Sequence, residues 1–125
     1  MNKAKFFAVA LASAMALTSV TAMAAGDAAK GKKVFKKCKA CHSTKAGKKK
    51  VGPSMFGVVG RKAGTAKGYR FSKAMKGSGL TWDEATLDKF LKKPKKLIKK
   101  TKMGFGGLKK DSQRADVIAY MKTLK

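Results

Sequence analysis

A Cys-Lys-Ala-Cys-His run at residues 38–42 limits what this chain can fold into more than any other feature of it. Cys38 and Cys41 are the only cysteines, and His42 is the only histidine. At this spacing two thiols bind the vinyl groups of a haem while the adjacent imidazole reaches its iron. The run therefore predicts one covalently bound haem c.

Other chemistries fit the run less well. A thioredoxin-like redox pair would follow a strand in an α/β chain, and the sequence shows no strand-like alternation. A zinc site would need carboxylates to complete the ligand set that Cys38, Cys41 and His42 begin. A Ser/His/Asp triad would also have to use His42, and six acidic residues in the whole chain leave little for calcium.

The amino-terminal segment 1–24 has the pattern of a cleaved signal peptide. A positive start precedes an apolar run from Phe6 to Val20, and Ala22-Met23-Ala24 supplies the small residues that a signal peptidase reads. We place the cut before Ala25. An uncleaved membrane anchor is the alternative, but the run is shorter than the roughly 20 apolar residues that span a bilayer. The pattern predicts a periplasmic protein whose single domain covers residues 25–125.

The core of that domain is small. Residues 25–125 contain 25 large apolar side chains, counting Val, Ile, Leu, Met, Phe, Trp and Tyr. Two cysteines with two residues between them close no useful disulfide loop. A large apolar ring tied to the chain would supply the missing centre of the core.

Three segments have the apolar spacing of helices, which predicts a small, loop-rich, all-α domain. They are Ala28 to about Lys37 after a capping Asp27, a segment that begins with the capping-box spacing of Thr81-Trp82-Asp83-Glu84, and Asp111 or Ser112 to about Leu124. Gly31 within the first segment indicates a close approach of another backbone. Pro94 ends or restarts the second helix, and residues 42–79 are expected to be mostly loop.

A six-coordinate iron needs a second axial ligand, and with one histidine that ligand is Met, Lys or an exogenous molecule. Four methionines follow the motif: Met55, Met75, Met103 and Met121. Met121 falls on the apolar stripe of the last helix, and Met55 lies too close to His42 along the chain. Met103 stands in a loop beside glycines that allow a close approach to a ring, so it is preferred, with Met75 as the remaining candidate.

With these features the chain resembles the class I c-type cytochromes, and especially the cytochrome c2 and mitochondrial cytochrome c group. The matching landmarks run through the whole of residues 25–125: Gly26-Asp27, Gly31, Phe35, the 38–42 run, Gly52-Pro53, Gly60-Arg61-Lys62, Gly68-Tyr69, Leu80-Thr81-Trp82, Pro94-Lys95-Lys96, Thr101-Lys102-Met103, Phe105 and Arg114 to Tyr120. The resemblance implies three to five helices wrapped around one haem, with the first and last helices crossing.

The resemblance also implies roles for nine residues. Cys38 and Cys41 would hold the haem covalently, and His42 and Met103 would be the axial ligands of its iron. Pro53 would accept the His42 ring N–H, Phe105 would guard the exposed haem edge, and the haem propionates would lie beside Arg61, Trp82 and Thr101. The chain departs from the mitochondrial pattern at Phe71 and Phe90, which replace tyrosines, and at Lys99-Lys100, which replaces Pro-Gly.

Function follows from the resemblance as an expectation. The chain would be a soluble, monomeric, periplasmic electron carrier and not an enzyme, exchanging electrons with a cytochrome bc complex and with a terminal oxidase or photosynthetic reaction centre. Its charge of +25, far above what solubility requires, predicts acidic partner faces, with no membrane insertion and no specific nucleic acid. A collar around the haem edge is expected from Lys36, Lys37, Lys39, Lys95, Lys96, Lys102, Lys109 and Lys110. In the rival interpretation, a haem enzyme or ligand sensor, Met103 does not hold the iron.

Overall fold

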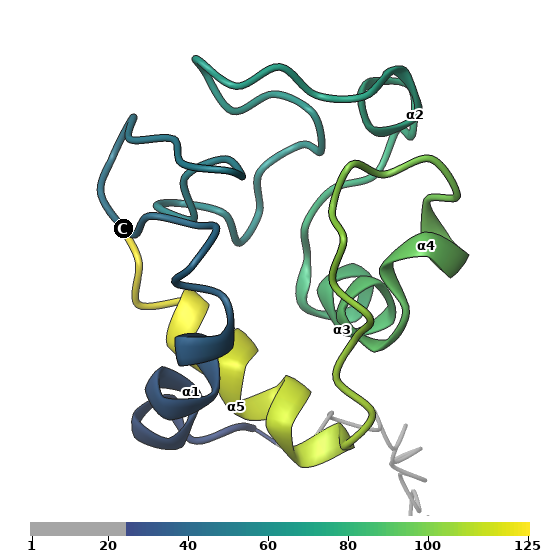
Figure 1. The fold of residues 1–125 in the computed structure, drawn as a ribbon. Helices are drawn as coiled ribbons and strands as arrows, with labels where there is room; N and C mark the ends of the chain where they lie inside the picture. The colour runs from purple at the N-terminus through teal and green to yellow at the C-terminus, as the bar shows by residue number, and fades with distance from the viewer. Residues whose placement is uncertain (1–24) are drawn as a thin grey trace, which may run out of the picture.

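The computed structural model describes residues 25–125, so the expected signal peptide and its cleavage site lie outside the described residues. The described part is helical (Figure 1). Its elements are α1 (Ala28–Val34), the 3-10 turn η1 (Phe35–Lys37), α2 (Lys73–Lys76), α3 (Glu84–Lys92), α4 (Pro94–Leu97) and α5 (Asp111–Met121). Within residues 25–125 the only β contact is an isolated antiparallel bridge between Lys62 and Thr81. The all-α prediction is confirmed.

The first and last helices cross and pack against each other, as Figure 1 shows for α1 and α5. A Cβ at Gly31 would stand closer than 3.0 Å to the backbone of Asp116, so only glycine allows this crossing. The Phe35 and Tyr120 rings pack with their centroids 5.2 Å apart. Asp27 caps α1 through its carboxylate and receives help from α5, because Asp116 Oδ1 accepts the backbone N–H of Asp27 at 2.8 Å.

The start of α3 differs from the sequence prediction. The N-cap is Asp83, whose carboxylate accepts the Thr86 N–H at 2.7 Å, and Glu84 is the first helical residue. The capping box headed by Thr81 is therefore wrong. Thr81 pairs instead with Lys62 in the isolated bridge, which holds it in an extended conformation before the helix begins.

Residues 42–79 are mostly loop, as predicted, but they contain one short helix that was not predicted, and the end of α5 also differs from the prediction. α2 is a single turn inside the segment expected to be mostly loop, and Ser72 caps it by accepting the Met75 N–H at 3.1 Å. α5 ends at Met121 and not near Leu124, because the N–H groups of Thr123 and Leu124 turn back to carbonyls three residues earlier. Pro94 restarts the chain as the first residue of α4, one of the two predicted outcomes.

Arg114 of α5 fastens the carboxyl-terminal half together. Its side chain is 3% exposed and donates to Asp88 Oδ1 of α3 at 2.8 Å and to the carbonyls of Leu108 and Lys109. It also pairs with Asp111. The irregular segment between α4 and α5 is thus tied to both α3 and α5, which fixes the loop that carries Met103. No helix in residues 25–125 is long and apolar enough to cross a membrane.

Candidate functional site

A cavity of about 500 Å³ lies in the middle of the molecule, and its lining is mostly apolar. The segment with residues 38–53 (blue, left in Figure 1) and the segment with residues 101–105 (green, right) both line it. All nine predicted site residues are among the lining: Cys38, Cys41, His42, Pro53, Arg61, Trp82, Thr101, Met103 and Phe105. The fold therefore brings together, around one space, residues that are spread from position 38 to position 105 of the sequence.

The His42 imidazole is held from two sides. Its Nδ1 lies 2.8 Å from the carbonyl oxygen of Pro53, so Nδ1–H donates to that carbonyl and Nε2 keeps the lone pair that can bind a metal. A Cβ on Gly52 would come within 3.0 Å of three atoms of the ring, so glycine is required there. The backbone N–H of His42 also bonds to the Cys38 carbonyl at 2.9 Å, which folds the motif into a turn.

Burial lowers the pKa of His42 below its ordinary value. The hydrogen bond to Pro53 works in the opposite direction, and the positive charges of Arg61 and Lys50 lower the pKa further. The imidazole is consequently neutral at neutral pH. A neutral imidazole is the form that ligates iron.

The two thiols lie at the edge of the cavity and are not joined to each other. Cys38 is half-buried and Cys41 is exposed. Burial raises the pKa of the Cys38 thiol, Cys41 raises it further, and Lys37 partly opposes both. Among residues 25–125 no three His, Cys, Asp or Glu side chains are grouped so that they could hold a metal ion. The thiols fit attachment of a group better than a zinc cluster.

Lining the cavity does not by itself select one methionine, because Met55, Met75, Met103 and Met121 all line it. The N–H of Met55 bonds to the carbonyl of Ser43 at 2.8 Å, so the backbone of Met55 is tied to the residue next to His42. Met121 is buried in α5, which packs on α1. Met75 lies in α2 and Met103 in the chain between α4 and α5, and these two remain the candidate ligands.

Met103 is placed by two contacts of its neighbours. The buried Thr101 accepts the Met103 N–H through Oγ1 at 3.3 Å. Lys102 Nζ donates to the carbonyl of Arg70 at 2.7 Å, which links the Met103 segment to the segment that carries Tyr69 and Phe71. Those two rings pack edge to face with centroids 4.7 Å apart and also line the cavity.

Arg61 and Trp82 are brought side by side by backbone bonds. The Trp82 N–H donates to the Arg61 carbonyl at 2.9 Å, and the Trp82 carbonyl accepts from Gly60 at 2.8 Å. The Arg61 guanidinium donates to the carbonyls of Ser54 and Phe56, and burial lowers its pKa. The Trp82 ring packs on Phe90 with centroids 4.9 Å apart, so Phe90 serves as a packing residue.

Val51 and Arg70 are among the residues of the site that sequence reasoning missed. Val51 lines the cavity although it is 74% exposed and stands at the end of a lysine run, where no apolar periodicity marks it. Arg70 contributes its carbonyl to Lys102, and a backbone acceptor carries no sequence signal.

The residues present fit a covalently bound haem. The cavity volume lies within the roughly 300 to 1,000 Å³ of ligand pockets. Two thiols and a neutral imidazole stand at its edge in one turn of chain, and the imidazole nitrogen that a metal does not need is already bonded to Pro53. Gly52 leaves the room that the His42 imidazole ring requires.

Comparison with known proteins gives a consistent result. The model of the cytochrome c family matches residues 28–125. Cytochrome c2 of Rhodomicrobium vannielii is 52% identical over 120 residues, which are 95% of this chain and 96% of the relative. Cytochrome c-554 of Methylosinus trichosporium is 43% identical over 122 residues, or 97% of this chain and 92% of the relative.

A solved structure also matches. Cytochrome cH from Methylobacterium extorquens has a TM-score of 0.76 and 54% sequence identity, covering 78% of this chain and 99% of its own. The similarity therefore includes both the sequence and the arrangement of the helices.

Proposed function

Because the chain belongs to the cytochrome c family, in the group of the cytochromes c2, we propose that it is a soluble periplasmic carrier that shuttles single electrons between membrane-bound redox complexes. Family membership makes it an electron-transfer protein with one covalently bound haem c, and not an enzyme. One observation carries the assignment of residues: a single apolar cavity is lined by all nine predicted site residues.

Haem c supplies the one-electron chemistry, since its iron alternates between Fe(II) and Fe(III). We assign Cys38 and Cys41 to covalent attachment of the haem, and His42 and Met103 to binding of its iron. With both residues bound, the iron would be closed to oxygen and peroxide. Pro53 accepts the His42 Nδ1–H and Gly52 lies against the ring, so both residues hold the imidazole in one orientation.

The other cavity residues shield and orient the ring. We assign Arg61, Trp82 and Thr101 to the surroundings of the haem propionates and Phe105 to the exposed edge. Arg61 has further N–H groups besides those that bond to Ser54 and Phe56, and these are available to an anionic group. The apolar lining excludes water and so favours transfer without large solvent rearrangement.

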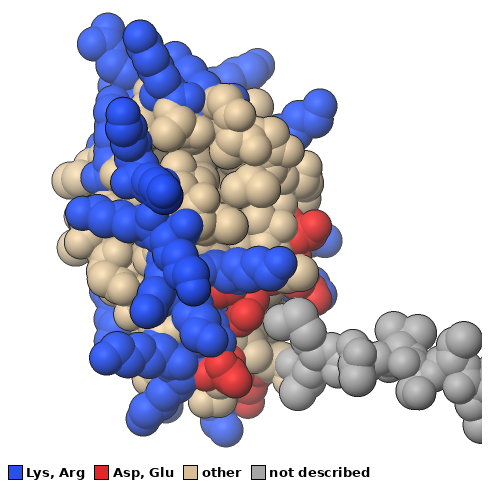
Figure 2. All heavy atoms as spheres, turned by 90° about the vertical axis from the view of Figure 1, so that its right-hand side faces the viewer, with Lys and Arg blue, Asp and Glu red and all other residues tan. Residues whose placement is uncertain are grey.

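The charge of the protein is unevenly placed. All six carboxylates are engaged, as N-caps, in ion pairs or in backbone bonds: Asp27, Asp83, Glu84, Asp88, Asp111 and Asp116. The ion pairs found in residues 25–125 use Arg114 and Lys122 as their cations. Figure 2 shows lysines and arginines spread along one side and the top of a face whose acidic groups gather low on it.

The eight lysines expected to form a collar around the haem edge are all exposed: Lys36, Lys37, Lys39, Lys95, Lys96, Lys102, Lys109 and Lys110. Positive charge in this amount attracts acidic surfaces and raises association rates. We propose as partners the acidic faces of a quinol-oxidising cytochrome bc complex and of a terminal oxidase or photosynthetic reaction centre. The bacterial cytochrome c2 relatives support the periplasmic location.

The test is an optical spectrum of the purified holoprotein in both oxidation states, followed by carbon monoxide. A carrier closed by His42 and Met103 shows the Met-to-iron charge-transfer band in the ferric form, and its reduced spectrum does not change with carbon monoxide. Ready binding of carbon monoxide would contradict the proposal and favour a haem enzyme or ligand sensor.

A further inference from the structure

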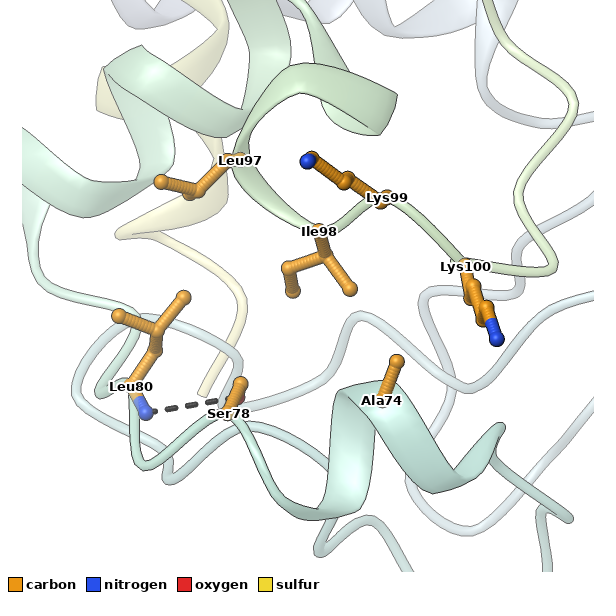
Figure 3. Close-up of a pocket in the computed structure, with 7 residues that line it drawn as sticks. All are labelled: Ala74, Ser78, Leu80, Leu97, Ile98, Lys99 and Lys100. Atoms are coloured by element: carbon orange, nitrogen blue, oxygen red, sulfur yellow. Dashed lines mark hydrogen bonds between the residues drawn. The ribbon is translucent and has the colours of Figure 1, made fainter.

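A second cavity, here called the α2 groove, lies between α2 and the chain that leaves α4 (Figure 3). It has a volume of about 390 Å³ and is open to solvent. It is lined by Ala74, Ser78, Leu80, Leu97, Ile98, Lys99 and Lys100. None of these residues lines the first cavity, which is called the haem cavity from here on.

The interior of the groove is aliphatic. Ile98 points toward α2 in Figure 3, and Ala74 faces it from that helix. The one hydroxyl group, that of Ser78, is already paired, since it donates to the Met75 carbonyl at 2.8 Å and accepts the Leu80 N–H at 3.4 Å. The groove therefore offers an apolar surface with no unpaired hydroxyl.

The charged rim of the groove comes from Lys99 and Lys100, the pair that departs from the Pro-Gly of the mitochondrial pattern. They occupy the centre of a turn closed by the Thr101 N–H and the Ile98 carbonyl at 3.1 Å. No non-glycine residue in 25–125 has a positive φ, so this turn is not of the type that needs glycine at its third position. Both side chains are exposed, and neither is in any ion pair found in the described part.

The groove and the haem cavity lie back to back. Ala74 lines the groove while the next residue, Met75, lines the haem cavity. In the same way Lys100 lines the groove and Thr101 lines the haem cavity. One layer of chain therefore separates an occupant of the groove from the haem site.

We propose that the α2 groove anchors an acidic protein partner by taking one of its aliphatic side chains, while neighbouring carboxylates pair with Lys99 and Lys100. The inference rests on the proposed function, because an electron carrier must dock briefly on proteins. Docking surfaces combine a buried apolar anchor with complementary charge at the rim. The α2 groove provides the apolar pocket for such an anchor, and Lys99 and Lys100 provide the charge.

The test uses the reduced holoprotein with labelled methyl groups and two probe peptides, acetyl-Glu-Glu-Leu-Glu-Glu-amide and its Leu→Ala counterpart. The leucine peptide should shift the NMR signals of Leu80, Leu97 and Ile98 and bind about fivefold more tightly than the alanine peptide, because it buries additional methylene and methyl groups. Ala74→Leu fills the groove and should remove this difference, while circular dichroism and the Met-to-iron band report whether that variant is folded.

Charge is tested with two matched double variants. The double variant Lys99→Glu with Lys100→Glu should bind the leucine peptide about tenfold or more weakly than the unchanged protein does. Lys92→Glu with Lys93→Glu makes the same charge change at another exposed lysine pair and should weaken it less than threefold. If both double variants lose the same affinity for the leucine peptide, the binding is a general effect of positive charge and the proposal is wrong. Equal affinity of the unchanged protein for the two peptides would also overturn it.

Sodium octanoate is the third probe. If it shifts the same methyl signals at lower concentration than the leucine peptide, the groove is a site for small amphiphiles and the proposal is wrong. None of these measurements depends on carbon monoxide binding, so a failure here is distinguishable from a failure of the electron-carrier proposal.

Discussion

The Nδ1 atom of His42 lies 2.8 Å from the carbonyl oxygen of Pro53. This contact joins the only imidazole of the chain to the start of the loop that covers it, and it fixes which ring nitrogen faces a metal. Gly52 lies against the same ring, so residues 52 and 53 together shape the seat of the imidazole.

Gly52→Ala should displace the His42 ring, because the added Cβ would come within 3.0 Å of three ring atoms. Overpacking of this kind lowers the free energy of unfolding by about 1–3 kcal/mol. Guanidinium denaturation followed by the haem absorbance measures the change. Gly106→Ala, where a Cβ meets no atom within 4 Å, is the control. If the two variants have the same stability, the imidazole seat is not tight.

Lys102→Ala should loosen the Met103 segment, because it removes the hydrogen bond from Lys102 to the Arg70 carbonyl. A hydrogen bond contributes about 0.5–1.5 kcal/mol net, so azide should bind the ferric protein roughly two- to tenfold more tightly. An azide titration gives the affinity. Lys102→Arg retains a hydrogen-bond donor, so this variant should bind azide as weakly as the unchanged protein does. Lys96→Ala is a second control, because it removes an exposed lysine of α4. Removing a positive charge by itself weakens the binding of an anion, so an equal rise in azide affinity in Lys96→Ala would contradict the role of the Lys102 hydrogen bond.

Arg114→Ala should be among the most damaging single changes outside the haem cavity. Burial acts to lower the pKa of Arg114, but Asp88 and Asp111 outweigh it and raise the pKa, so the buried cation is charged and fully paired. Removing one partner of such a network costs about 3–5 kcal/mol of unfolding free energy. Lys122→Ala breaks the exposed pair with Glu84 and should cost about 0–1 kcal/mol. Chemical denaturation of both variants measures their unfolding free energies. Equal losses in Arg114→Ala and Lys122→Ala would contradict this role of Arg114.

Asp83 should make stability depend on pH in the acid range. Hydrogen bonds to Thr86 hold the pKa of Asp83 below its ordinary value of 3.8 in the folded protein. Between the two pKa values the unfolded chain binds more protons, so the contribution is present above about pH 4 and is lost as the pH falls through the folded pKa. Asp83→Asn keeps a capping side chain, and its melting temperature should fall less steeply between pH 5 and about pH 2.5. An unchanged slope would count against this role.

Much of the site could be predicted because its chemistry is local or depends on rare residue types. The 38–42 run predicted the attachment point, and Gly31 correctly indicated the close crossing of α1 and α5. Contacts between segments that are distant in the sequence could not be predicted from it. The Arg114 network depends on Asp88 in another helix, and Lys102 is held by a backbone carbonyl at residue 70.

Short elements escaped prediction for a physical reason. One turn of helix, as in α2, contains too few residues to show a 3.6-residue apolar period. The sequence prediction placed a capping box at Thr81, but Thr81 pairs with Lys62 in a bridge and Asp83 caps α3. The α2 groove is formed by two segments without regular periodicity, so only the folded chain reveals it.

The axial pair of His42 and Met103 is the central claim, and the ferric absorption spectrum of two matched variants tests it most directly. Met103→Leu should abolish the Met-to-iron charge-transfer band, whereas Met75→Leu, at another methionine that lines the cavity, should keep it. If the band survives in Met103→Leu and disappears in Met75→Leu, the assignment of the second ligand is wrong.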